Sequence, residues 1–315
     1  MHLSQAHIIT ALVSTAPLVS SLKIASALSV LEWTPELIAK EDYFQGDVDI
    51  VNGGIASLFS DPTVDLGSNS ETQLLSQFGS HKNLRTIGTV AEVYYRIVAN
   101  KKSGIETLED LKEKKIGALR STSSEYYVQE YLATVGLKPE DYTIVNGLPC
   151  LQEPCAANSF PALLKSGSID AIGIWEPSVE LGAQALGSDA IVFGSNQTTY
   201  REIYNLATTS EKLDDPEKRE EIVQFLKALK QAEEVFRTDP SKVISRAAEA
   251  VKTNSTLLEA VWPVHRWDVR LPSDFLDVLE DEDKFVASYN RRDAIPRETL
   301  ATLIDSSVLD EALAV

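Results

Sequence analysis

The feature that most constrains the fold of this chain is a regular alternation of short apolar runs and short helical patterns between about residues 97 and 200. The apolar runs have the length of single buried strands and cover residues 114–120, 143–146, 169–175 and 190–193. Helical patterns separate them at about 124–135, 161–167 and 177–186. Strands that alternate with helices are typical of a parallel, doubly wound sheet. We therefore expect an α/β unit over this stretch.

The sequence on both sides of this stretch indicates a second unit of the same class. Strand patterns occur at 22–28, 47–54, 64–68 and 84–100. Helices are expected to begin after Thr34, which we assign as an N-cap with Pro35 at the first helical position, after a loop that follows the strand at 64–68, at Asp215-Pro216 and at Asp239-Pro240. An apolar stripe at helical spacing, predicted to be core, is formed by Ile222, Val223, Phe225, Leu226, Leu229 and Phe236. The 315 residues are enough for two lobes, which we place at 22–96 with 201–315, and at 97–200.

The first 21 residues resemble a secretory signal. They contain no Asp, Glu, Lys or Arg, and the apolar stretch Ile8–Val19 is too short to span a bilayer. Val19 and Ser21 suit the small-residue positions before a cleavage site. We predict a signal peptide over 1–21 and a secreted or periplasmic protein. The alternative is a leader on a cytoplasmic protein.

The two cysteines and two sequons bear on the same question. Cys150 and Cys155 lie five residues apart, a spacing that in an oxidising compartment predicts a small disulfide-closed ring. Asn196 and Asn254 stand in N-x-S/T patterns, which makes them glycosylation candidates if the host is eukaryotic.

Charge and motif content narrow the function classes. The formal net charge of −18 argues against nucleic acid and against anionic membrane surfaces as partners. We find no GxSxG, P-loop, GxGxxG or HExxH pattern, and His81 and His265 lie far from either cysteine. The sequence therefore predicts no catalytic residue, no metal site and no cofactor.

The segment 120–136 is the most informative one for binding. A strand ends there and a run of hydroxyl residues leads into a helix, with Thr122 or Ser123 as N-cap and Glu125 at the capping-box position. The first-turn N–H groups with the hydroxyls of Ser123 and Ser124 suit a ligand group that accepts hydrogen bonds. The alternative is that these hydroxyls only cap the helix.

Two further segments place polar side chains just past strands, where open α/β sheets bind ligands. Trp175 and Glu176 end one strand, and Asn69, Glu71 and Thr72 follow another. The alternatives are ordinary packing for the indole, and turn and cap chemistry for the second group.

Together these segments resemble the solute-binding proteins that serve importers for taurine, aliphatic sulfonates and nitrate, whose relatives include the pyrimidine-precursor synthases of thiamin biosynthesis. The family's recurring motifs appear in order as 65–68, 121–127 and 169–177, and 104–118 and 261–276 match its inter-lobe connection and its end. The resemblance covers about residues 22 to 305.

The resemblance implies a two-lobed periplasmic-binding-protein type 2 fold, each lobe a mostly parallel sheet flanked by helices. It implies a small-molecule ligand in a cleft that closes by rotation near 96–100 and 200–206, no membrane insertion, a monomer and, in a bacterial host, an importer partner. The family's ligand contacts fall on Asn69, Glu71, Tyr95, Thr122, Ser123, Ser124, Tyr126, Trp175, Glu176 and Tyr204.

The sequence also departs from the family. The segment after the first strand lacks the family's Q-x-G pattern, the Cys150–Cys155 loop looks inserted, and Glu71 adds a carboxylate that favours amine-bearing or hydrogen-bond-donating ligands. An enzyme like the pyrimidine-precursor synthases is the first alternative, although Lys23 and Lys40 are the lysines nearest the first strand and the family's Cys-rich motif is missing. A ligand-sensing interaction domain is the second alternative.

Overall fold

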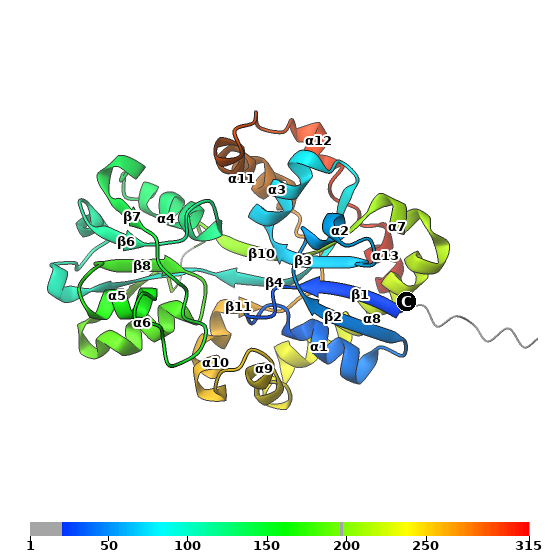
Figure 1. Ribbon diagram of the computed structural model, residues 1–315, viewed down its shortest axis with the longest axis horizontal. Coiled ribbons are helices and arrows are strands. Elements are labelled where there is room, and N and C mark those ends of the chain that lie inside the picture. The colour runs from blue at the N-terminus through cyan, green and yellow to red at the C-terminus, as the bar shows by residue number, and fades with distance from the viewer. Residues whose placement is uncertain (1–20, 196–197, 315) are drawn as a thin grey trace, which may run out of the picture.

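The computed structural model of the chain describes residues 21–195 and 198–314. The predicted signal peptide, apart from Ser21, and the sequon residue Asn196 lie outside these ranges. Two β-sheets organise the described residues, and Figure 1 shows them side by side with helices around each.

The first sheet holds six strands in the order β11-β4-β10-β3-β1-β2. Its strands are β1 (Ser21–Ser26), β2 (Asp47–Asn52), β3 (Leu66–Ser70), β4 (Leu84–Tyr94), β10 (Arg201–Thr209) and β11 (His265–Arg266). β1 pairs in parallel with β2 and β3, whereas β10 runs antiparallel to β3 and β4. β1 to β4 therefore run in one direction, and β10 and β11 run in the other.

The second sheet has the order β7-β6-β8-β5-β9. Its strands are β5 (Arg96–Asn100), β6 (Lys115–Gly117), β7 (Thr143–Val145), β8 (Ala171–Ile174) and β9 (Ala190–Phe193). β6 is parallel to β7 and β8, and only β5 is reversed. The expectation of two mostly parallel α/β sheets is confirmed.

The reversed strands have a simple origin at the two places where the chain passes between the sheets. Tyr95 alone separates β4 from β5, so the chain continues from one sheet into the other without a crossover helix. The chain returns between β9 and β10 (Figure 1). Closure about these passages, and the lobe boundaries at 96/97 and 200/201, remain predictions.

Helices cover both faces of both sheets. Their bounds are α1 (Thr34–Ile38), α2 (Ser57–Ser60), α3 (Glu71–Ser80), α4 (Ser123–Ala133), α5 (Phe160–Lys165), α6 (Ser178–Leu186), α7 (Ser210–Asp214), α8 (Pro216–Thr238), α9 (Ile244–Ala250), α10 (Ser255–Val261), α11 (Phe275–Asn290), α12 (Arg297–Ala301) and α13 (Ser307–Leu313). None of the helices in the described part of the chain is long and apolar enough to cross a membrane.

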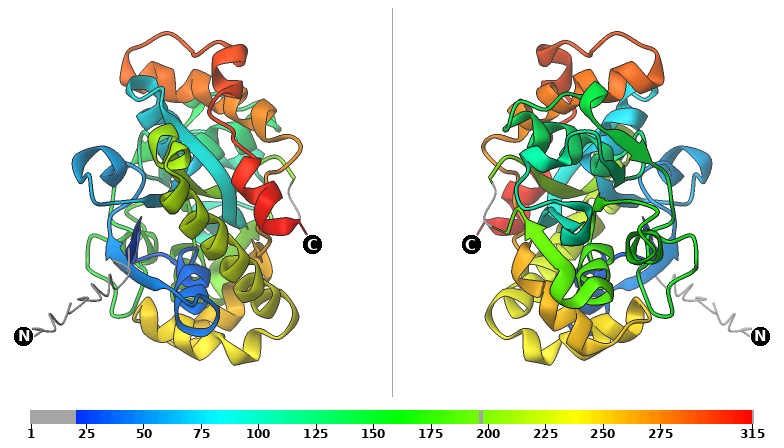
Figure 2. Two further views of the ribbon diagram at one scale, coloured as in Figure 1. Left: turned by 90° about the vertical axis from the view of Figure 1, so that its right-hand side faces the viewer. Right: turned by 90° about the vertical axis from the view of Figure 1, so that its left-hand side faces the viewer.

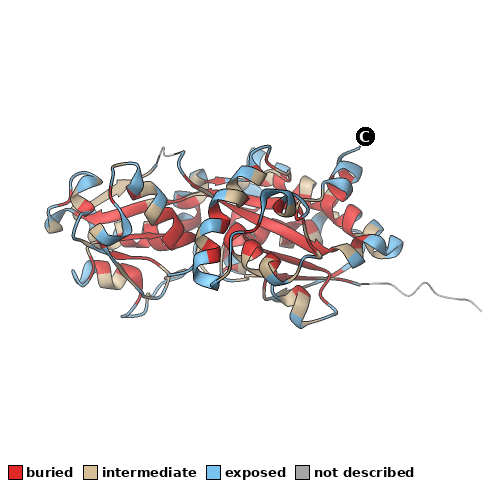
Figure 3. Ribbon diagram, turned by 90° about the horizontal axis from the view of Figure 1, so that it is seen from above, coloured by how far each residue is buried: buried red, intermediate tan, exposed pale blue. Residues whose placement is uncertain are grey.

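Alternation along the strands divides the core into layers. Leu22 and Ile24 of β1 face the layer that holds α1, α8 and α13, and Ala25 faces the layer of α3, α11 and α12. Figure 2 shows α8 beside α13, and Figure 3 shows the strands of both sheets buried beneath exposed helix surfaces. In the second sheet α4 covers one face, and α5 and α6 cover the other.

Helix α8 forms where the sequence predicted it. Pro216 stands at its first position, and Asp215 caps it by accepting from the N–H groups of Glu217 (3.0 Å) and Lys218 (3.3 Å). Every member of the predicted apolar stripe is buried. The stripe is core, as expected.

Several local predictions were wrong. Thr34 is the first residue of α1 rather than its cap, because its hydroxyl donates back to the carbonyl of Leu31 (2.8 Å). No loop separates β3 from α3, since Glu71 follows Ser70 directly. Asp239-Pro240 opens a short 3-10 turn, and α9 begins only at Ile244.

The predicted ring is present. Cys150 and Cys155 form a disulfide with their Cα atoms 5.4 Å apart. The hydroxyl of Ser178 donates to the carbonyl of Cys150 and accepts from its N–H, both at 2.8 Å, so the ring is anchored to α6. The sequon residue Asn254 uses its side chain to cap α10, where it accepts from the N–H of Leu257 at 2.8 Å.

Candidate functional site

A cavity of about 230 Å³ lies where the carboxyl ends of β1, β3 and β8 meet the first turn of α4 and the start of β10. Both sheets contribute to its walls. The lining residues are Ala27, Ser29, Val30, Glu32, Asn69, Ser70, Gln73, Thr122, Ser123, Trp175, Glu202 and Tyr204. Open α/β sheets bind ligands at the carboxyl ends of their strands, so this is the candidate site.

Five residues proposed from the sequence line this cavity. They come from all three sequence segments and from β10: Asn69, Thr122, Ser123, Trp175 and Tyr204. The structure thus brings together side chains that lie up to 135 positions apart in the chain.

Two further predicted residues lie directly behind the lining. Tyr95 donates to Glu202 and shares a hydrogen bond with the Ser123 hydroxyl (3.1 Å). Ser124 donates to the carbonyl of Gly173 (2.7 Å) and accepts from the N–H of Leu119 (3.1 Å). Ser124 therefore fastens α4 to the second sheet.

The other four predicted residues lie outside the lining of this cavity. Glu71 accepts from the Tyr200 hydroxyl (2.5 Å) and the N–H of Ile203 (2.7 Å), and Thr72 shares a hydrogen bond with Ser70 (3.1 Å). Glu176 pairs with Arg96 at 2.6 Å. Tyr126 lines a different cavity.

Sequence reasoning missed two acidic residues that do line the cavity, Glu32 and Glu202. Glu202 was open to prediction, because Tyr204 was proposed and residues two apart on a strand share a face. Glu32 gave no such signal, since it lies in the irregular segment between β1 and α1 where the family motif is missing.

Glu202 is held by neutral donors. Its side chain is 5% exposed and accepts from the hydroxyls of Tyr95 and Ser123, the latter at 3.2 Å. Burial, and then the charges of Glu32 and Glu71, raise the pKa of Glu202 well above its usual value.

Glu32 is buried still more completely, at 1% exposure. Its Oε1 lies 3.6 Å from Nε2 of His265, and its Oε2 has no hydrogen-bond partner among the described residues. A buried carboxylate oxygen without a donor is costly, and Glu32 lines the cavity, so a donor on a bound molecule would stabilise this carboxylate.

A third carboxyl stands one layer deeper. Ser26 donates to Glu36, and the hydroxyls of Ser26 and Ser68 lie 2.7 Å apart. Glu36 is fully buried, and this burial raises its pKa to about 7. Ser26 and Ser68 directly precede the lining residues Ala27 and Asn69, so Glu36 is hydrogen-bonded just behind the wall of the cavity.

The first turn of α4 is capped as the sequence suggested, with one difference. Thr122 is the N-cap and accepts from the N–H of Ser124 (3.2 Å). Glu125 reaches the N–H of Ser121 (2.8 Å) rather than that of Thr122, so the expected capping box is displaced by one residue. Trp175 supplies a flat wall opposite, and its buried Nε1 has no acceptor in the described part of the chain.

A second cavity of about 620 Å³ adjoins the first, and Ser29 lines both. Its walls are largely apolar and include Leu28, Trp33, Pro149, Leu151 and Val251. Leu151 belongs to the disulfide-closed loop and Pro149 directly precedes it, so this loop contributes to the wall of the adjoining cavity.

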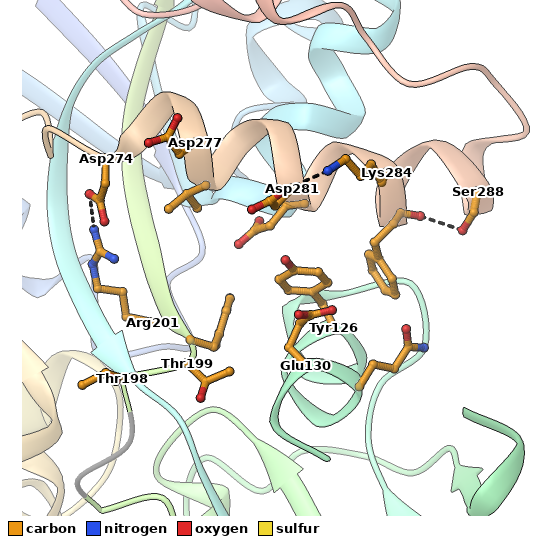
Figure 4. A pocket seen from close by; sticks show the side chains of 15 residues that line it. Tyr126, Glu130, Thr198, Thr199, Arg201, Asp274, Asp277, Asp281, Lys284 and Ser288 are labelled. Carbon is orange, nitrogen blue, oxygen red and sulfur yellow. Dashed lines mark hydrogen bonds and ion pairs between the residues drawn. The ribbon is translucent and has the colours of Figure 1, made fainter. Parts of the chain in front are cut away.

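A third cavity, of about 610 Å³, lies between α4 and α11 (Figure 4). Two ion pairs lie in its wall, Arg201 with Asp274 at 2.7 Å and Lys284 with Asp281 at 2.8 Å, and Glu130 and Glu282 line it without an ion pair among the described residues. Tyr126 faces α11 here, with its ring 5.3 Å from that of Phe285. Of the residues proposed from the sequence, Tyr126 alone lines this third cavity, whereas five line the first, so we place the ligand in the first cavity.

The lining of the first cavity also limits its chemistry. Its twelve residues include two carboxylates but no Lys, Arg, His or Cys. No group of three or more potential metal ligands occurs among the described residues. The arrangement suits reversible binding of a small molecule.

Comparison with known proteins agrees with this architecture. The family described as NMT1/THI5 like matches residues 34–243, more than half of the chain, and confirms the resemblance expected from the motifs. A Bacillus subtilis (strain 168) protein named for binding aliphatic sulfonates is 33% identical over 136 residues. That alignment covers 43% of this chain and 38% of the relative, so the chain matches less than half of the relative's length.

Two solved structures share the fold. The alkanesulfonate-binding protein SsuA from Xanthomonas axonopodis pv. citri, bound to MOPS, has a TM-score of 0.69 at 19% identity, over 91% of this chain and 98% of that chain. The desulfurization enzyme DSZB has a TM-score of 0.64 at 15% identity, over 93% and 98%. The fold therefore occurs in both binding proteins and enzymes.

Proposed function

The chain belongs to the NMT1/THI5-like family, and from this premise we propose that it is a solute-binding protein that captures a small organic molecule between its two lobes. The observation that carries the proposal is the composition of the 230 Å³ cavity, whose walls come from strand ends of both sheets. A ligand that touches both walls stabilises the conformation in which they approach.

Closure would be centred on the two passages between the sheets. Tyr95 stands at the first passage and its hydroxyl contacts both Ser123 of α4 and Glu202 of β10. A ligand that contacts Ser123 and Glu202 would therefore act on the two residues that hydrogen-bond to Tyr95, which lies between the two sheets. Closing would also exclude water and strengthen the polar contacts inside.

The cellular setting follows from the same proposal. A solute-binding protein of this fold works outside the cytoplasm, and the Cys150–Cys155 disulfide supports an oxidising compartment. In a bacterial host the closed form would be recognised by the membrane component of an importer. The protein would act as a monomer, since one chain supplies both walls of the cavity.

An enzymatic role is the second candidate, because the desulfurization enzyme DSZB shares the fold. The residues present do not favour the pyridoxal-phosphate chemistry of the pyrimidine-precursor synthases. Lys23 lies outside the lining and donates to Asp61 (2.9 Å) and Thr63 (3.0 Å). A visible absorption band after incubation with pyridoxal phosphate would support the enzyme instead.

The proposal is tested by a thermal-shift screen of the chain from Leu22 onward against sulfonates, nitrate, amino acids, amines, pyrimidines and aromatic acids. A ligand at about 100 times its dissociation constant adds roughly 2.7 kcal/mol to the free energy of unfolding. For a chain of this size that raises the melting temperature by about 4 °C.

Two tryptophan variants make the result specific. Trp175→Ala should abolish the ligand-induced rise, because the indole lines the cavity. Trp262→Ala is the matched control: this indole is also partly buried but packs against Phe236 and Trp267, so the variant lowers the basal melting temperature and keeps the rise. Equal rises in melting temperature for both variants would mean that the ligand binds outside the proposed cavity.

A further inference from the structure

The charge of the candidate site points to a class of ligand. Two carboxyl groups, Glu32 and Glu202, line the cavity at 1% and 5% exposure, and Glu36 stands behind its floor. The lining contains no cationic side chain. Buried carboxylates are stable when they are paired, so the first question is what pairs with these.

Two arginines near the cavity form ion pairs elsewhere, and Lys252 lines the adjoining cavity rather than this one. Arg201 precedes Glu202 in the chain, but its guanidinium contacts Asp274 (2.7 Å) and Glu92 (3.3 Å). Arg96, at the first passage, contacts Glu176 (2.6 Å). Neither arginine forms an ion pair with Glu32 or Glu202 in the described part of the chain.

The partners that Glu202 and Glu32 do have leave room for a further donor. Glu202 accepts from two neutral hydroxyls. Glu32 has the His265 ring 3.6 Å from one oxygen, while its other oxygen has no partner within the described residues. A cation in the cavity would supply the missing charge and donors to both groups.

The same geometry opposes an anion. The first turn of α4 is the place where the sequence suggested an acceptor group of a ligand would bind. In the structure the Ser123 hydroxyl there donates to Glu202, so a carboxylate of the protein itself holds that position. A sulfonate would meet Glu202 and Glu32 at close range, where its charge opposes their ionisation, whereas a bound cation favours the ionised carboxylates.

Size and shape complete the description of the ligand. A volume of 230 Å³ corresponds to about eight water molecules in the liquid, which suits a compact head group. Trp175 lines the cavity, and an indole attracts a cation that lies over its ring. The adjoining, largely apolar cavity past Ser29 can receive an alkyl or aryl tail.

We propose that the cavity binds a small organic cation, with an ammonium or guanidinium group between Glu32 and Glu202 and its hydrocarbon part against Trp175. This inference rests on the proposed solute-binding function and specifies its ligand class. The proposed ligand class differs from the sulfonates named in the descriptions of the Bacillus subtilis relative and the Xanthomonas axonopodis structure.

The test uses three probes that share one skeleton and differ in charge: phenethylamine, 2-phenylethanol and 2-phenylethanesulfonate. Isothermal titration at neutral pH should show the ammonium binding at least about tenfold tighter than the alcohol, and no heat of binding for the sulfonate. Glu202→Gln and Glu32→Gln should each weaken the ammonium at least about tenfold and leave the alcohol within about twofold. Glu259→Gln, on the exposed side of α10, is the control and should change nothing.

The outcomes distinguish failure of the cation inference from failure of the solute-binding proposal. If the sulfonate or the alcohol binds as tightly as the ammonium, the cation inference is wrong and solute binding stands. If no amine binds but the wider panel yields a neutral or anionic ligand that depends on Trp175, the inference is again overturned alone. If nothing in either panel binds to a protein that melts cooperatively, both proposals fail.

Discussion

The buried carboxyl groups of the first lobe are the residues on which this account depends most. Glu32, Glu36 and Glu202 lie within a few side chains of one cavity, and all are nearly inaccessible to solvent. Chains do not bury acids without partners unless folding or binding compensates for the loss of hydration. Their protonation states should therefore be visible in the stability of the protein.

Glu36 gives a pH prediction with a definite sign. Its pKa is raised from 4.5 to about 7, so the folded protein holds this proton more tightly than the unfolded chain. The contribution of Glu36 to the free energy of unfolding is complete below pH 4.5 and is lost as the pH rises through about 7.

Glu36→Gln should remove this loss. Urea denaturation at pH 5 and pH 8 should show a smaller decline for the variant than for the wild type, by up to about 3 kcal/mol. Glu217→Gln, at an exposed position of α8, should retain the wild-type decline. An unchanged decline in Glu36→Gln would mean that this carboxyl is not protonated in the folded protein.

Single residues also mark the limits of the sequence prediction. Trp175, Asn69 and Ser123, which line the candidate cavity, could be proposed from the sequence because each was expected to follow a strand. Glu71 could not be excluded in the same way, because only the packed structure shows that its carboxylate turns toward Tyr200 and the backbone of Ile203. Contacts between residues more than a hundred positions apart leave no local pattern in the sequence.

At the scale of elements, α4 carries the part of the site that was predicted best. Thr122→Ala removes the hydroxyl that accepts from the N–H of Ser124, and should lower the free energy of unfolding by about 1 kcal/mol. Thr134→Ala, at the other end of α4, removes a hydroxyl that bonds only the carbonyl of Tyr131 and should cost less. Equal losses, measured by urea denaturation, would show that the cap is not what stabilises this helix.

The disulfide ring gives a second prediction at this scale. Closing so short a loop restricts the unfolded chain modestly, so Cys150→Ser with Cys155→Ser should cost about 2 kcal/mol. The loop should keep its place, because Ser178 holds both backbone groups of residue 150. Reductant should lower the melting temperature of the wild type and leave the double variant unchanged. A wild type insensitive to reductant would mean that the bridge does not form in solution.

Elements were predictable where they follow a local period. The strands and helices of 97–200, and α8, came from apolar spacing and capping residues. The direction of β5 and β10 did not, because it depends on how the chain passes between two sheets. The segment 27–33 was also missed as part of the site, because an irregular loop has no helical or strand periodicity from which to predict which side chains share a face.

At the scale of the whole molecule, the structure provides contacts that link the two sheets besides the strand passages. Tyr289 of α11 donates to Glu125 of α4 at 2.6 Å, and Phe285 packs on Tyr126. These contacts join α4 to α11, and the candidate cavity lies at the first turn of α4. A hinge motion that changes the cavity would also move α4 relative to α11.

The measurement that tests the central claim most directly is small-angle X-ray scattering with and without the tightest-binding member of the probe panels. Closure of two lobes on a ligand predicts a smaller radius of gyration at saturation, and no change for Trp175→Ala under the same conditions. A ligand that binds the wild type and stabilises it while the radius of gyration stays the same would contradict capture by lobe closure.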